Sequence, residues 1–226
     1  ENWRTLYRLP PAVIDRLRSE TVKRAHLPLL SALPCAELHS HLGGILGVKA
    51  QKRVGQAVWD GLSTGEHSIG LERSRELLRR AECGEPWPWN WPDQLGAKRS
   101  PEDARLRSAA AAALLQHLSV AELERRLFSD TLPRVALAHS RHEFEAYERP
   151  GELCGSAILG HDAAVQAYAE AVVEEASAQR LTYLELRCSP HKYLGGGAVR
   201  FVSGFRCALD QARARLAGAC EIRMVW

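Results

Sequence analysis

The chain lacks several features that would place it in a specialised class of proteins. It has no run of about 18 or more apolar residues, so the sequence predicts no transmembrane helix. It does not begin with a signal peptide, because its first residues, Glu1-Asn2-Trp3-Arg4, are mostly polar. Its net charge is only +3 and the charges are scattered, which disfavours direct binding to nucleic acid. We therefore expect a cytoplasmic protein that contacts neither membranes nor nucleic acids.

The cysteines lack the spacing of a metal-binding or redox motif. The six of them form no CxxC pair, so a zinc site made of cysteines is not predicted. With 226 residues, 46% of them apolar and 25% charged, the chain is not a short secreted scaffold held by disulfides. We interpret the cysteines as reduced, mostly buried thiols in one large domain or two small ones.

The most informative stretch runs from Glu37 to Gly44 and has the sequence ELHSHLGG. It belongs to a short segment, residues 35–42, that is predicted to be a β-strand. Alternate residues of a strand point to the same face, so the imidazoles of His39 and His41 can reach one metal ion. Gly43 and Gly44 allow the backbone to turn sharply and leave space beside that ion. The sequence therefore predicts a metal site with His39 and His41 as ligands.

Helical patterns lie on both sides of this strand. Residues 1–33 are predicted to form a helical lead-in, with a helix opened by Pro10-Pro11. A polar helical stretch follows the strand and runs to about residue 80. Residues 84–92 contain three prolines and three tryptophans, which predicts that 84–101 is a loop.

The clearest helical region begins at Pro101. Ser100 is a candidate N-cap, and the alanines at 109–113 have high helix propensity. A second helix is predicted over 119–128, because Ser119 and Glu122 have the spacing of a capping box. Residues 61–139 together are predicted to be an inserted helical or lid region.

The remainder of the chain alternates helices and strands. A helix over 162–179, capped by Asp162, precedes a strand over 181–188, and a helix over 199–216 precedes a strand over 220–226. This order is typical of parallel βα units. It predicts an α/β fold, an incomplete TIM-like (β/α) barrel with a helical insertion after the first strand. Because a complete barrel needs about 250 residues, we expect residues 1–226 to be the N-terminal part of one barrel domain.

Three segments resemble the adenosine deaminase family. AELHSHLGG at 36–44 is similar to the family's E-L-H-x-H-L-D-G segment. FEAY at 144–147, with the helix at 162–179, is similar to its F-L-x-x-F-D segment and the helix that follows. YLELRCSPH at 183–191 is similar to its Y-x-E-x-R-x-S-P-H strand. The order of the segments agrees with the family, and the resemblance covers residues 30–60 and 140–226.

The resemblance implies a zinc-dependent hydrolytic deaminase that converts an adenine nucleoside or nucleotide to its inosine form and releases ammonia. His39 and His41 would be two of the zinc ligands, and Gly43 and Gly44 would contact the substrate. Gly43 stands where the family has an aspartate near the sugar's 5′-hydroxyl, and its absence removes a charge that would repel a phosphate. We therefore expect a substrate larger or more anionic than adenosine, such as ATP, and adenosine itself stays open as the alternative. Similar deaminases of anti-phage defence, including CRISPR-associated ones, act on ATP.

The family's remaining zinc ligands and its general acid follow the third strand and have no counterpart in this sequence. Because a catalytic zinc usually has three protein ligands, we expect the isolated 226 residues to be inactive. We also expect the protein to be a homo-oligomer. Two other functions remain open, namely another amidohydrolase-type metal hydrolase and a non-catalytic barrel scaffold.

The structural roles of three further polar residues can be predicted. Glu185 and Arg187 share one strand face and are expected to form an ion pair, and His161 is expected to be a solvated or core histidine.

Overall fold

The computed structural model describes residues 10–19, 21, 23–82, 100–124, 152–216 and 220–226. The chain divides into two compact units, Glu1–Pro34 and Cys35–Trp226. The predicted loop at 84–101 and the FEAY segment at 144–147 lie outside the described residues, apart from the two positions at the end of the loop. Among the described helices, none combines the length and the apolar character needed to cross a bilayer.

The first unit is helical in its described part, as its sequence predicts. It contains α1 (Pro11–Ser19), the short 3-10 turn η2 (Arg24–His26) and α2 (Leu27–Ala32). Several of its apolar side chains are exposed, among them Val13, Leu27 and Leu29.

The second unit contains a parallel sheet of three strands in the order β1-β2-β3. The strands are β1 (Cys35–His41), β2 (Leu181–Arg187) and β3 (Glu221–Val225), which confirms the three predicted strand segments. Leu184 and Leu186 point to one face of β2 and are fully buried in the core. The alternate residues of β2, beginning with Tyr183, are only half-buried. One face of β2 is therefore packed, and the other carries the half-buried Tyr183, Glu185 and Arg187.

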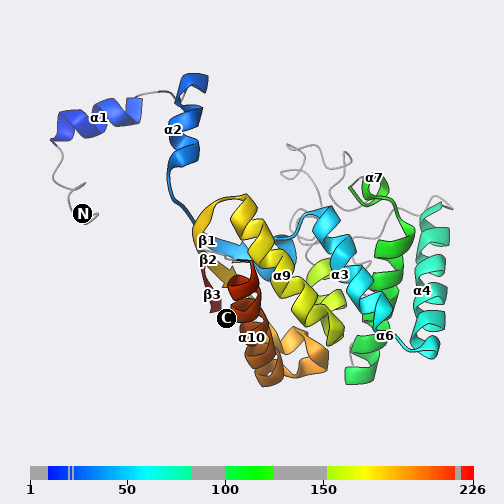
Figure 1. The fold of residues 1–226 in the computed structure, drawn as a ribbon. Coiled ribbons are helices and arrows are strands. Elements are labelled where there is room, and N and C mark those ends of the chain that lie inside the picture. The colour runs from blue at the N-terminus through cyan, green and yellow to red at the C-terminus, as the bar shows by residue number, and fades with distance from the viewer. Residues whose placement is uncertain (1–9, 20, 22, 83–99, 125–151, 217–219) are drawn as a thin grey trace. The chain divides into compact units, whose positions relative to one another are not determined.

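Two long helices belong to the core around the sheet. They are α9 (Ala163–Ala178) and α10 (Ala198–Arg215), which lie side by side (Figure 1). Tyr168 of α9 meets Phe205 of α10 edge to face, with ring centroids 6.1 Å apart. Between β2 and α10, the turns η8 (Pro190–Lys192) and η9 (Leu194–Gly196) include Gly195 and Gly196, whose φ angles of 65° and 90° favour glycine.

A second group of helices packs beside α9. It comprises α3 (Val48–Asp60), α4 (Thr64–Glu82), α6 (Pro101–His117) and the short α7 (Val120–Leu123). Two of the three predicted caps are confirmed here: Ser100 accepts the N–H of Asp103 at 3.1 Å, and Ser119 and Glu122 form a capping box. The short helices η6 (Glu152–Ala157) and η7 (Ile158–Gly160) also pack against α6.

Helix α6 is the most deeply buried of these helices. Its alanines at 109–113 are all 0% exposed. Glycines of three neighbouring elements allow this close packing, because an added Cβ would lie 2.8 Å or less from α6. At Gly55 and Gly70 the nearest α6 atoms would be 2.8 Å away, and at Gly160 the carbonyl oxygen of Ala104 would be 2.5 Å away. The small residues on both sides thus place the helices close together.

The predicted barrel is wrong. The described residues contain three strands, which form an open sheet, and most of the described chain is helical. A complete TIM-like barrel has about eight parallel strands with its helices packed around them, whereas here the helices between β1 and β2 pack mainly on one another around α6. The α/β class and the parallel strand order are retained, and the correct description is a small parallel sheet joined to a helical layer.

Candidate metal site

Two histidine side chains meet on one side of β1. The Nε2 atoms of His39 and His41 lie 3.2 Å apart, and their ring centroids are 5.2 Å apart. Zinc binds imidazole nitrogen at about 2.0–2.1 Å, and two such bonds at a tetrahedral angle place the nitrogens roughly 3.3 Å apart. The spacing of this histidine pair therefore suits a single zinc ion. Both side chains are exposed, so an ion can reach them from solvent.

The backbone of β1 is irregular beside this pair. The register between β1 and β2 shifts between Glu37 and Ser40, which gives β1 an extra residue at this point. The Glu37 carboxylate accepts the backbone N–H of His39 at 2.9 Å. Glu37 therefore provides a side-chain partner for the backbone of a candidate ligand, a role that the sequence did not reveal.

The histidine pair lies at the carboxyl end of the sheet. His41 is the last residue of β1 and pairs with Arg187, the last residue of β2. In open α/β sheets, ligands bind outside the carboxyl ends of the strands. The position of the pair is therefore one where parallel sheets commonly hold their chemistry.

The predicted ion pair between Glu185 and Arg187 does not form. Instead, the Tyr183 hydroxyl donates to Glu185 at 3.0 Å, and this bond raises the pKa of Tyr183. In the part of the chain that the structure describes, the buried Nε of Arg187 has no hydrogen-bond partner. Tyr183, two residues before Glu185 on the same face of β2, is therefore the hydrogen-bond partner of Glu185 in place of Arg187.

The described residues supply only part of a zinc site. They contain no group of three or more His, Cys, Asp or Glu side chains that could hold a metal ion. A catalytic zinc usually has three protein ligands and a water. His39 and His41 therefore fit as two of the ligands.

Gly43 and Gly44 form the turn η3 (Leu42–Gly44) directly after His41. Neither glycine has a positive φ, so the turn does not depend on the left-handed backbone that glycine permits. Among the described residues, no atom lies within 4 Å of a Cβ added at Gly44. Substrate contact by Gly43 and Gly44 stays a prediction.

Four cysteine side chains are described, and all four have free thiols: Cys35, Cys188, Cys207 and Cys220. Burial raises the pKa of Cys188, which follows β2, to about 11. Its thiol is therefore protonated at neutral pH, and Cys188 is a poor candidate for a nucleophile.

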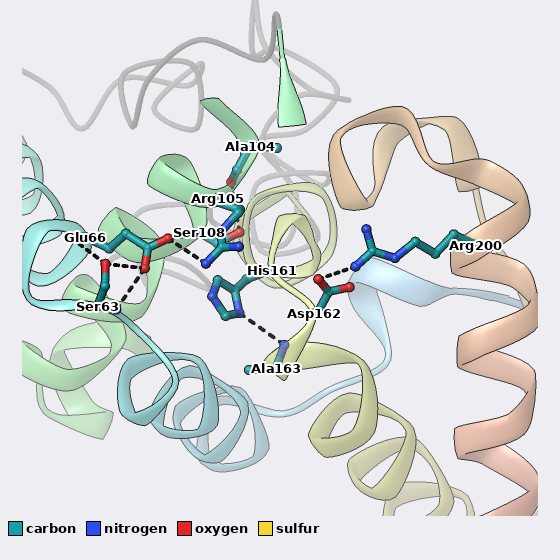
Figure 2. A network of polar contacts seen from close by, with 9 residues as sticks. All are labelled: Ser63, Glu66, Ala104, Arg105, Ser108, His161, Asp162, Ala163 and Arg200. Carbon is teal, nitrogen blue, oxygen red and sulfur yellow. Dashed lines mark hydrogen bonds and ion pairs between the residues drawn. The ribbon is translucent and has the colours of Figure 1, made fainter. Parts of the chain in front are cut away.

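A separate polar cluster joins the turn before α4 to α6 (Figure 2). The Glu66 carboxylate accepts hydrogen bonds from Ser63, at 2.7 Å from the hydroxyl and 2.8 Å from the backbone N–H, and from Arg105 at 2.9–3.0 Å. Burial raises the pKa of Glu66, but these hydrogen bonds and the charge of Arg105 outweigh it and lower the pKa overall. Glu66 is therefore held ionised between two helices.

His161 lies beside this cluster and is only 6% exposed. Its Nδ1 accepts the N–H of Ala163 at 3.1 Å, so His161 caps α9 (Figure 2). The predicted cap, Asp162, instead forms an ion pair with Arg200 of α10. The Nε2 of His161 is buried and has no hydrogen-bond partner among the described residues. His161 is therefore a core histidine with one unsatisfied nitrogen.

The burial of His161 predicts a pH-dependent stability. Burial, and then the nearby charge of Arg105, lower its pKa below the ordinary 6.5, whereas Glu66 and Asp162 act in the opposite direction. The unfolded chain therefore takes up a proton first, and the free energy of unfolding should fall as the pH drops below 6.5. His161→Asn keeps an acceptor for Ala163 but does not titrate, so urea unfolding at about pH 7.5 and about pH 5.5 should differ less in this variant. An unchanged difference would contradict this assignment.

No protein-family model, curated protein or solved structure matches this chain. The comparisons therefore neither support nor oppose the resemblance to adenosine deaminases.

Proposed function

We propose that this chain carries part of the active site of a zinc-dependent hydrolytic deaminase that acts on an adenine nucleoside or nucleotide. The observation that carries the proposal is the 3.2 Å separation of the His39 and His41 Nε2 atoms at the carboxyl end of a parallel strand. The resemblance of 36–44 and 183–191 to adenosine deaminases supplies the reaction class. Metal binding alone would fit many hydrolases, so both observations are needed.

The chain's own residues have distinct roles in this proposal. His39 and His41 hold the ion through Nε2, and the Glu37 carboxylate holds the backbone N–H of His39. When bound, zinc supplies an activated water for hydrolysis near neutral pH. Water then replaces the amino group of the adenine ring, ammonia leaves, and the product is the inosine form.

The turn after His41 carries no side-chain charge and has space at Gly44. Among the residues that the structure describes, no atom lies within 4 Å of a Cβ added at Gly44, and Gly43 has no carboxylate to repel a phosphate. These two properties suit a nucleotide such as ATP as well as adenosine. The proposal therefore includes both substrates.

The test is ammonia release from adenosine and from ATP, measured side by side with the natural full-length protein, with and without a zinc chelator. Chelator-sensitive release from ATP would support both the reaction and the interpretation of Gly43. Release from adenosine alone would support the deamination reaction and contradict ATP as a substrate. Bound zinc without ammonia release would favour another amidohydrolase-type reaction, and the absence of both would favour a scaffold.

A further inference from the structure

The peptide unit between Leu42 and Gly43 is fixed by contacts from distant parts of the chain. It lies one residue beyond His41, the second candidate ligand. The Tyr168 hydroxyl, on α9, donates a hydrogen bond to the Leu42 carbonyl. Tyr168 is 0% exposed and Leu42 only 1%, so this bond lies in the core, shielded from competing water.

A second contact meets the same peptide unit from η6. A Cβ added at Gly155 would lie 3.0 Å from the Gly43 Cα and 3.6 Å from the Gly43 nitrogen. The backbone of Gly155 is therefore close against the turn, and a larger residue there would displace it. Tyr168 and Gly155 together leave the Leu42–Gly43 peptide little freedom to move.

The side chains of the histidine pair have no comparable support. Both are exposed, and neither Nδ1 has a hydrogen-bond partner among the residues that the structure describes. Histidine ligands are usually oriented by such a partner. The direction of His41 must therefore be set through its backbone, by the pairing with Arg187 on one side and by the Leu42–Gly43 peptide on the other.

We infer that Tyr168 is a positioning residue for the metal site: it does not touch the ion, but its bond to Leu42 holds His41 in the direction needed to bind it. This inference rests on the proposed zinc function. Removing a group that orients a ligand typically costs 10–100-fold in metal affinity. Tyr168→Phe keeps the ring and its contact with Phe205 and removes only the hydroxyl, so we expect zinc affinity to fall by about 10–100-fold.

The experiment measures zinc affinity of the natural full-length protein by competition with a chromophoric chelator, well below the unfolding temperature. Cobalt is bound in a parallel sample, because its visible absorption reports the ligand geometry. Tyr193→Phe is the matched control: it makes the same change at another buried tyrosine, which packs on Phe201 with ring centroids 4.5 Å apart. We expect weaker zinc binding and an altered cobalt spectrum for Tyr168→Phe, and wild-type values for Tyr193→Phe.

The outcomes separate the two proposals. Wild-type protein that binds no zinc would overturn the metal site and this inference with it. Wild-type protein that binds zinc, with unchanged affinity and cobalt spectrum in Tyr168→Phe, would overturn the positioning role alone. Gly155→Ala is an independent second variant, because it disturbs the same peptide from η6, and we expect it to weaken zinc binding as well.

Discussion

Replacing either His39 or His41 by alanine is expected to lower zinc affinity and deamination by more than about 100-fold. Loss of a group that merely orients a ligand costs about 10–100-fold, so loss of a ligand itself should cost more. Each variant leaves one imidazole, which cannot hold the ion at the 3.2 Å spacing that the pair provides. The effect should be similar for the two positions, because both nitrogens would bind the same ion.

The measurements are the zinc content after dialysis and the rate of ammonia release with the natural full-length protein. His117→Ala is the matched control, since His117 is also exposed but lies at the end of α6, near Trp59. We expect this control to keep its zinc and its activity. If the His39→Ala and His41→Ala variants keep their zinc, the metal is bound at a different site.

Gly160→Ala should reduce the free energy of unfolding by roughly 1–3 kcal/mol, the usual cost of overpacking a core. The added Cβ would lie 2.5 Å from the carbonyl oxygen of Ala104 and 2.6 Å from the Ser108 hydroxyl. That hydroxyl also donates to the carbonyl of Ala157, so moving it would strain a second bond. The Ala104 carbonyl and the buried Ser108 hydroxyl cannot move far, so η7 and α6 would have to move apart.

Urea unfolding of the second unit measures this change, and Gly204→Ala is the matched control. A Cβ at Gly204, in α10, would meet no atom within 4 Å. Alanine is favoured over glycine inside a helix by about 0.8–1.0 kcal/mol, so this control should be slightly stabilised. The same substitution is therefore expected to have opposite signs at two positions. Equal effects would show that α6 is less tightly enclosed than its contacts indicate.

Local signals predicted most of the helices and strands correctly. Ser100 and Ser119 each accept a hydrogen bond from a backbone N–H three residues later. Because these contacts are so local, the sequence pattern was enough to predict where the two helices begin. The residue pattern of 181–188 likewise predicted β2, and the structure adds that Leu184 and Leu186 are its buried residues. For the candidate site, alternate spacing on a strand was enough to predict that His39 and His41 meet.

Long-range features were not predictable in the same way. The bond from Tyr168 to Leu42 joins residues 126 positions apart, and no local pattern in the sequence links them. An all-alanine stretch has no distinguishable faces, so its pattern could not show that α6 would be enclosed on every side. The barrel prediction failed for a related reason, because the order of helices and strands does not show whether intervening helices pack on the sheet or on each other.

The strand that carries the histidine pair has a partner that is distant in the sequence. In the part of the chain that the structure describes, β1 pairs with β2, and the hydroxyl of Thr182 in β2 donates to the Cys35 carbonyl across 147 positions of sequence. Contacts of such long range are slow to form, because the intervening chain must first be ordered. We therefore expect β1 to pair with β2 late in folding, after the helices have formed. Zinc binding would then indicate that the fold is complete. During refolding, we expect zinc binding to recover later than the helices form.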